Sequence, residues 1–192
     1  QAAYNNDTAS RKLKLLFHHS GINRRYSAVS DFDNRKSETN IFGIDKPVPN
    51  VEKRLNVFKD NAAPLAIEAI DNSFKKLNRT ISEFGITHLI TVTCTGIYAP
   101  GLNTEIMEQL DLPNDIFHIA VNYMGCNAAF PALKIADMIA KTEENAKVLI
   151  VCVELCTLHF RPKDNDANLL ANTIFGDGAA AVIVVSDVAA KH

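Results

Sequence analysis

The sequence predicts an α/β fold, in which helices cover both faces of a β-sheet. After Gly85, short apolar runs alternate with helical segments, the pattern of a sheet with crossover helices. These runs lack a strict alternation of polar and apolar residues, as expected for strands that are covered on both faces. A chain of 192 residues that is 47% hydrophobic can also bury a core without disulfide bonds.

The first third of the chain predicts two helices and a long loop. A helix is expected over about residues 9–20, before Gly21, and residues 22–54 have the composition of a surface loop. A second helix is expected to start at Asn61, with Pro64 in its first turn. Its predicted buried stripe consists of Ala66, Ile70, Phe74 and Leu77.

The remainder of the chain predicts four strands and two intervening helices. The helix expected at residues 128–141 is apolar on most sides, so we expect it to be buried. Pro131 fits this helix only if it lies in the first turn. The expected strands are residues 88–94, 116–121, 148–154 and 180–186, and the expected helices are residues 103–110 and 128–141.

Composition excludes several classes of function. The 20 Lys and Arg residues are balanced by 22 Asp and Glu residues, so we expect no nucleic-acid partner. The longest apolar run, residues 179–185, is far shorter than the roughly 18 residues of a membrane span. We therefore expect no membrane insertion, and without a visible secretory signal we expect a cytoplasmic protein. The four cysteines lack CxxC spacing, which predicts free thiols and no metal site.

Cys126 is the candidate nucleophile. It lies in VNYMGCNAA, where a strand ends in a glycine turn and an apolar helix begins. The unpaired N–H groups and partial positive charge of a helix N-terminus stabilise a thiolate. Small neighbours leave room for an acyl chain. The alternative is a buried structural cysteine, because free cysteines are commonly interior.

Other segments carry weaker signals. Phe175-Gly-Asp-Gly has two glycines around Asp177 ahead of a strand, and alone it indicates a turn in which backbones approach closely. Residues 93–101 and 153–160 follow expected strands, and α/β sheets place their sites at strand ends.

Taken together and in order, the motifs resemble the N-terminal half of type III polyketide synthases, the chalcone and stilbene synthase family. They are GITHLI (85–90), TGIYAPG (95–101), MGC (124–126), VLIVCVE (148–154) and FGDGAAA (175–181). The resemblance implies a thiolase-like fold, layered α-β-α with a mixed sheet. Residues 1–192 would then form one chalcone/stilbene synthase-like N-terminal domain, a piece of a longer protein.

The resemblance implies an acyltransferase. Cys126 would accept an acyl group from an acyl-CoA starter, and the carbanion from decarboxylated malonyl-CoA would attack the Cys126 thioester in a Claisen condensation. The substrates are thus CoA thioesters, with no permanently bound cofactor and no metal. The family also implies a homodimer.

The resemblance also assigns a cavity and a CoA site. Phe175 matches the aromatic gatekeeper between the CoA tunnel and the cavity, and Arg24 and Arg25 match a basic segment near the CoA phosphates. His159 is larger than its counterpart in plant chalcone synthases, which implies a different, bacterial-type product. The matching cavity residues, whose bulk limits chain length, are Cys94, Thr95, Cys156, Leu158 and His159.

The catalytic His and Asn of the family lie in its second half, so this chain alone is expected to be inactive. Two alternatives remain open: an initiating-class β-ketoacyl carrier-protein synthase, and a non-catalytic thiolase-fold dimerisation module in which Cys126 is merely buried. A cysteine hydrolase is disfavoured, because the sequence offers no His partner for Cys126.

Overall fold

The computed structural model describes residues 7–32, 41–42, 47–163 and 165–191. The chain divides into two compact units: unit 1 contains residues 1–57 and 155–178, and unit 2 contains residues 58–154 and 179–192. The helices are α1 (Asp7–His19), α2 (Val51–Leu77), α3 (Ile81–Phe84), α4 (Leu102–Gln109), α5 (Ala129–Thr142) and α6 (Asp166–Ile174). The strands are β1 (His88–Thr93), β2 (Phe117–Asn122), β3 (Lys147–Leu155) and β4 (Asp177–Val185).

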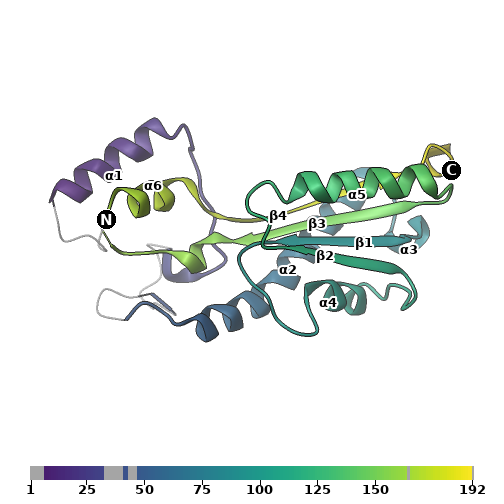
Figure 1. Ribbon diagram of the computed structural model, residues 1–192, viewed down its shortest axis with the longest axis horizontal. Coiled ribbons are helices and arrows are strands. Elements are labelled where there is room, and N and C mark those ends of the chain that lie inside the picture. Colours follow the sequence, from purple (N-terminus) through teal and green to yellow (C-terminus); the bar gives the residue numbers. More distant parts are fainter. Residues whose placement is uncertain (1–6, 33–40, 43–46, 164, 192) are drawn as a thin grey trace. The chain divides into compact units, whose positions relative to one another are not determined.

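Unit 2 is built on a mixed sheet with the strand order β2-β1-β3-β4. β1 runs parallel to both neighbours, with His88 opposite Phe117 on β2 and Val148 on β3. The Ser186 N–H donates to Ala146 O (3.0 Å), so the end of β4 lies beside the start of β3 and the two strands are antiparallel (Figure 1). The expected α/β architecture with a mixed sheet is confirmed.

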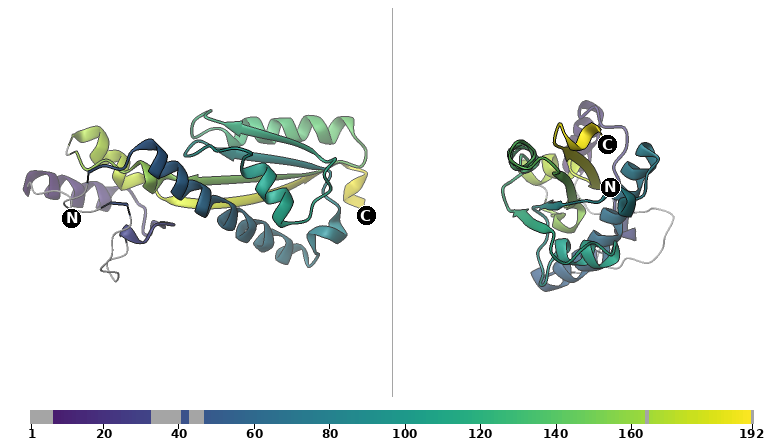
Figure 2. Two further views of the ribbon diagram at one scale, coloured as in Figure 1. Left: turned by 90° about the horizontal axis from the view of Figure 1, so that it is seen from below. Right: turned by 90° about the vertical axis from the view of Figure 1, so that its right-hand side faces the viewer.

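Helices cover the sheet of unit 2 on both faces. α5 lies on one face, and α4 with residues 58–77 of α2 lies on the other (Figure 2). Every residue of β1 is buried, which explains why its sequence shows no alternation of polar and apolar residues; His88, Thr91 and Thr93 are buried together with its apolar side chains. On the α5 side, Ala132 and Ala136 pack against a core of sheet residues: Ile90, Val92, Val121, Val148 and Ile150.

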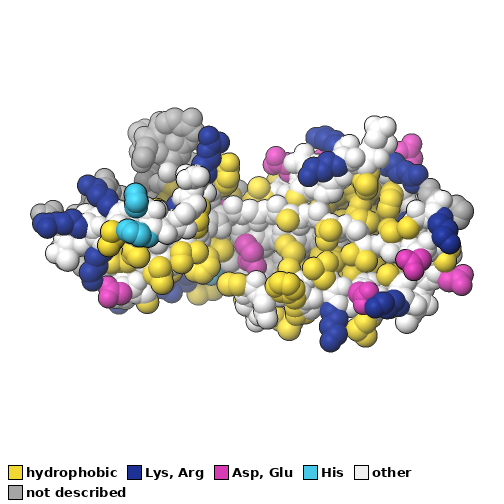
Figure 3. All heavy atoms as spheres, turned by 90° about the horizontal axis from the view of Figure 1, so that it is seen from above, with side chains coloured by type: hydrophobic (Ala, Val, Ile, Leu, Met, Phe, Trp, Pro, Cys, Tyr) yellow, Lys and Arg dark blue, Asp and Glu magenta, His cyan; other side chains and the backbone are white. Residues whose placement is uncertain are grey.

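The expectation that α5 is buried on most sides is wrong for the described residues. Only its Ala132 and Ala136 stripe is fully buried against the sheet. Phe130 is 73% exposed, Leu133 41% and Met138 59%. α5 has apolar side chains on more than one side, but the sheet covers only one of them. Hydrophobic side chains are therefore visible on the α5 face of unit 2 (Figure 3).

The expected start of the second helix is also wrong. α2 begins at Val51, and the Asn50 side chain caps it by accepting a hydrogen bond from the Lys53 N–H (2.9 Å). Asn61 lies inside the helix, as does Pro64. Of the predicted stripe, Ala66, Ile70 and Phe74 are buried, whereas Leu77 at the last position is 48% exposed.

Unit 1 contains α1 as expected and α6, which the sequence analysis missed. Ala9 and Leu13 of α1 form a small core with Leu169 of α6. Asn165 caps α6 by accepting from the Asn168 N–H (2.9 Å). An Asn-capped helix of nine residues gives a short signal that is easily taken for loop.

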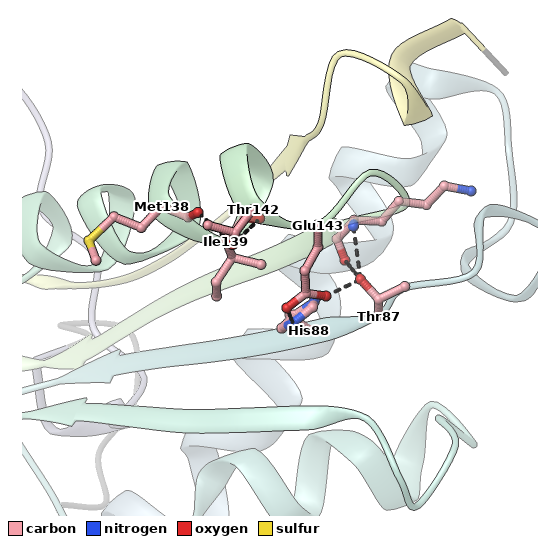
Figure 4. Close-up of polar contacts among 7 residues, drawn as sticks. Thr87, His88, Met138, Ile139, Thr142 and Glu143 are labelled. Atoms are coloured by element: carbon pink, nitrogen blue, oxygen red, sulfur yellow. Dashed lines mark hydrogen bonds and ion pairs between the residues drawn. The ribbon is translucent and has the colours of Figure 1, made fainter.

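At the edge of the sheet where β1 and β3 begin, polar contacts join the strands to α5 (Figure 4). His88 Nδ1 lies 2.8 Å from Thr87 Oγ1, and His88 Nε2 lies 3.4 Å from a Glu143 oxygen at the end of α5. The Lys147 N–H donates to Thr87 Oγ1 (2.8 Å). Within the described ranges, no helix is both long and apolar enough to cross a membrane.

Candidate active site

The carboxyl ends of the parallel strands β1, β2 and β3 meet at one edge of unit 2. The Tyr123 N–H, just beyond β2, donates to Thr93 O at the end of β1 (3.2 Å). Glu154, near the end of β3, contacts the residues that follow β1. This edge is where α/β sheets place ligand sites, and three predicted site residues of unit 2 lie here: Cys94, Thr95 and Cys126.

Cys126 lies in a tight turn between β2 and α5. Tyr123 (φ 56°) and Gly125 (φ 80°) both adopt the left-handed region, which reverses the chain after β2. The Ala128 N–H closes the turn on Gly125 O (3.1 Å), and α5 begins at Ala129. The structure therefore places Cys126 immediately before the helix, and Pro131 falls in the first turn, where its missing N–H is tolerated.

The Cys126 side chain is exposed. An exposed thiol does not fit the alternative in which this cysteine is buried structural packing. The role of Cys126 as acyl acceptor stays a prediction, and so does that of every other site residue named from the sequence.

Cys94 links the end of β1 to the Cys126 turn. Its thiol donates to Gly125 O (3.4 Å), the carbonyl that also closes the turn. Cys94 and Cys126 thus lie on two segments that are in direct contact.

Glu154 is a further residue of the candidate site, which the sequence analysis did not single out. Its two carboxylate oxygens accept from the Cys94 N–H (2.9 and 3.1 Å), and Oε2 accepts from Thr95 Oγ1 (2.7 Å). Hydrogen bonds to a carboxylate are the stronger kind, so this side chain fixes the segment after β1. The available signal was a charged residue directly after the apolar run 148–153 of β3.

Gly96 sets the path of the same segment. A Cβ atom at this position would come closer than 3.0 Å to three ring carbons of Phe58, which is 1% exposed. The backbone therefore runs directly over the Phe58 ring, and only glycine allows this approach. The ring also packs edge-to-face on Tyr98, with centroids 6.2 Å apart.

The other predicted cavity residues belong to unit 1. Cys156, Leu158 and His159 lie in a 3-10 turn, Cys156–His159, directly after β3; Leu158 is 1% exposed, while the His159 side chain is exposed. Phe175 follows α6 and is 48% exposed.

The two predicted CoA-contacting arginines, also in unit 1, differ in their surroundings. Arg24 is exposed. Arg25 is half-buried, with its guanidinium 4.7 Å from the ring centroid of Phe17 and Nη2 donating to Ser20 Oγ (3.1 Å). Arg25 therefore holds the loop after α1 in place, whatever else it binds.

Two further features concern a cysteine outside this site and the capacity to bind a metal ion. Burial, and to a smaller extent the charge of Glu154, raises the pKa of the Cys152 thiol on β3, which favours the protonated form of this thiol. Among the described residues, no group of three or more His, Cys, Asp or Glu side chains is arranged to hold a metal ion.

Comparison with known proteins identifies the family. Residues 2–188 match the family described as chalcone and stilbene synthases, N-terminal domain. The chain is 34% identical over 176 residues to a probable polyketide synthase 1 of Dictyostelium discoideum, covering 91% of this chain and 5% of that protein. It is 30% identical to the alpha-pyrone synthesis polyketide synthase-like Pks18 of Mycobacterium tuberculosis, covering 90% of this chain and 42% of that protein. It thus spans less than half the length of these relatives.

Solved structures agree with this assignment. The C-terminal type III polyketide synthase domain of Steely1 from Dictyostelium matches with a TM-score of 0.82 and 31% identity, over 96% of this chain and 49% of that one. PKS-I from the brown alga Ectocarpus siliculosus matches with a TM-score of 0.84 and 27% identity, over 92% and 47%. The expected thiolase-like α/β fold is confirmed. The chain belongs to the chalcone and stilbene synthase family and carries its N-terminal domain.

Proposed function

We propose that this chain is the nucleophile-bearing half of a type III polyketide synthase that condenses CoA thioesters. The observation that carries the proposal is the exposed thiol of Cys126, in the turn between β2 and α5 at the carboxyl edge of the sheet. The family assignment and the names of the relatives, which are polyketide synthases, support it.

The proposed reaction has two steps. The Cys126 thiolate attacks the carbonyl carbon of an acyl-CoA, a new carbon–sulfur bond forms, and CoA leaves as a thiolate that takes up a proton. Malonyl-CoA then loses CO₂, and the electron pair left on its α-carbon attacks the Cys126 thioester. The carbon–carbon bond forms as the bond to Cys126 breaks, which returns the thiolate and releases a β-ketoacyl-CoA.

Residues of this chain serve the two steps in different ways. The turn after β2 presents the exposed Cys126 thiol immediately before α5, where an acyl group can reach it. Glu154 and Cys94 hold the adjoining segment after β1 against this turn. By resemblance to the family, the bulk of the cavity residues limits the length of the product. Phe175 controls the passage between the CoA tunnel and the cavity.

The remaining machinery is proposed to come from a C-terminal domain, because the relatives are more than twice as long as the matched region. The catalytic His and Asn of the family would belong to it, so the chain alone would be inactive. We also propose a homodimer in the cytoplasm, with CoA thioesters as ligands and no resident cofactor.

Product formation tests the proposal in the full-length protein. The protein is incubated with malonyl-CoA and a fatty acyl-CoA, and pyrone or resorcinol products are sought by mass spectrometry. Products are expected from the wild type, and none from Cys126→Ala. Cys152→Ala is the matched control, because its thiol lies within β3 and outside the proposed site.

Three results would contradict the proposal. Condensation only when malonate is presented on a carrier protein would indicate an initiating-class β-ketoacyl synthase instead. Equal product from Cys126→Ala and Cys152→Ala would remove Cys126 from the chemistry. Slow, unselective alkylation of Cys126 in the wild type would favour a non-catalytic dimerisation module.

A further inference from the structure

Asp177, in the FGDG motif of unit 1, is the acceptor for two segments that are remote in sequence. Its Oδ1 accepts from the Thr157 N–H (2.7 Å), and its Oδ2 accepts from Thr157 Oγ1 (2.6 Å) and from the Ala28 N–H (2.8 Å). Its own N–H donates to Tyr26 O (2.8 Å). One carboxylate therefore ties residues 26–28 to the turn after β3.

Two other contacts reinforce this junction. The backbone at Gly176 passes so close to residues 25–26 that a Cβ there would lie 3.3 Å from Tyr26 O and 3.4 Å from Arg25 Cβ. Ser27 Oγ lies 3.1 Å from Thr157 Oγ1, so the hydroxyl that donates to Asp177 also meets the loop after α1. The glycine before Asp177 allows the close approach, and the carboxylate fixes it.

The joined segments carry different parts of the proposed site. Thr157 lies between Cys156 and Leu158, which are predicted to line the cavity, whereas residues 26–28 directly follow Arg24 and Arg25, predicted to contact CoA. Asp177 itself comes two residues after Phe175. A shift of the carboxylate would thus move a cavity segment and the arginine segment relative to each other.

We propose that Asp177 is a positioning residue that couples the cavity-lining turn, Cys156–His159, to the arginine segment, residues 24–28, and thereby sets product length. This inference rests on the proposed function. Asp177 acts through Thr157 and Ala28 and touches no substrate itself. Asparagine cannot replace it, because its amide nitrogen would face a donor where the carboxylate offers an acceptor.

Hydrogen exchange tests the coupling itself and does not depend on catalysis. In full-length Asp177→Asn, amides of residues 24–28 and of residues 156–159 are expected to exchange at least about 10-fold faster, both segments together. Asp166→Asn is the matched control in the same unit, because Asp166 makes one exposed ion pair, with Lys12 (2.7 Å). Faster exchange in only one segment, or in neither, would overturn the coupling.

Product distribution tests the consequence. Asp177→Asn is expected to change the ratio of shorter to longer polyketides by about 10-fold, since small displacements near reacting groups have large effects on rates. Partial unfolding would lower all products in proportion and leave the ratio unchanged. Asp166→Asn keeps the wild-type ratio, and an Asp177→Asn ratio equal to it refutes the inference.

Thr157 provides a second pair of variants in case Asp177→Asn fails to fold. Thr157→Val removes only the hydroxyl bonds and is expected to change the ratio in the same direction, whereas Thr157→Ser restores it. Equal ratios in both Thr157 variants would overturn the inference. If the wild type shows neither an acylated Cys126 nor any product, the proposed function fails, while the exchange measurement still decides the coupling.

Discussion

Replacement of Gly96 by alanine should destabilise unit 2 by overpacking. The new Cβ would lie closer than 3.0 Å to three carbons of the Phe58 ring, where about 3.5–4.0 Å is the optimal separation. Phe58 is 1% exposed and packs edge-to-face on Tyr98, so its ring cannot turn away without repacking the core. Overpacking of this kind costs about 1–3 kcal/mol of the free energy of unfolding.

Urea unfolding of the full-length protein, followed by circular dichroism, measures this loss. With a urea m-value of about 2 kcal/mol/M, the midpoint should fall by about 0.5–1.5 M. Gly178→Ala is the control, because a Cβ there meets open space, and its free energy of unfolding should change by less than about 0.5 kcal/mol.

A double variant separates the clash from any general effect of alanine. Phe58→Leu should relieve the contact, so the double variant should be more stable than the two single losses predict, by about 1 kcal/mol. Equal midpoints for Gly96→Ala and Gly178→Ala, or strictly additive losses in the double variant, would refute the close approach of the backbone to Phe58.

Three further predictions concern the cap of α2, the Cys126 turn and a buried thiol. Asn50→Ala should cost about 1 kcal/mol of unfolding free energy, because the Lys53 N–H loses its cap, while Asn50→Asp should retain the wild-type urea midpoint. Gly125→Ala should cost about 1–2 kcal/mol of unfolding free energy, because φ is 80° there; the new Cβ would make only an ordinary contact, 3.9 Å from Asn127 Oδ1, so the cost comes from the backbone, and an unchanged midpoint would contradict the turn geometry. Burial and the charge of Glu154 raise the pKa of Cys152, so the folded protein keeps this proton to a higher pH than the unfolded chain does. The free energy of unfolding is therefore unaffected by the ionisation of this thiol below the usual thiol pKa of 9.0, and it falls as the pH rises from there through the folded-state pKa. Cys152→Ala should therefore show a smaller loss of stability above pH 9 than the wild type, and parallel pH profiles would argue against it.

β1 and β3 were predictable because burial on both faces leaves a largely apolar run without polar/apolar alternation, whereas β2 and β4 show the same kind of run although most of their residues are exposed or half-buried. β1 was expected at residues 88–94 and observed at His88–Thr93. The position of Cys126 was also predictable, since a glycine turn between a strand and an apolar helix is a local pattern.

Features that depend on contacts remote in sequence were not predictable. Asn61 resembled a cap, but Asn50 had the same chemistry and a longer amphipathic segment behind it, and the helix began there. The residues that donate to Glu154 lie 59 and 60 residues away in the sequence, and those that donate to Asp177 lie 20 and 149 residues away. No local pattern therefore reveals which carboxylates hold the site segments. Likewise, the many apolar residues of α5 indicated a buried helix, but they did not reveal that the sheet would cover only the side with Ala132 and Ala136.

Acylation of Cys126 tests the central claim most directly. The full-length protein is incubated with a fatty acyl-CoA alone, digested, and its peptides are analysed by mass spectrometry. The account predicts one acyl group on the peptide that contains Cys126, and none on that peptide in Cys126→Ser. An acyl group on the Cys94, Cys152 or Cys156 peptide instead, or a wild-type protein that forms polyketides while Cys126 is never acylated, would contradict it.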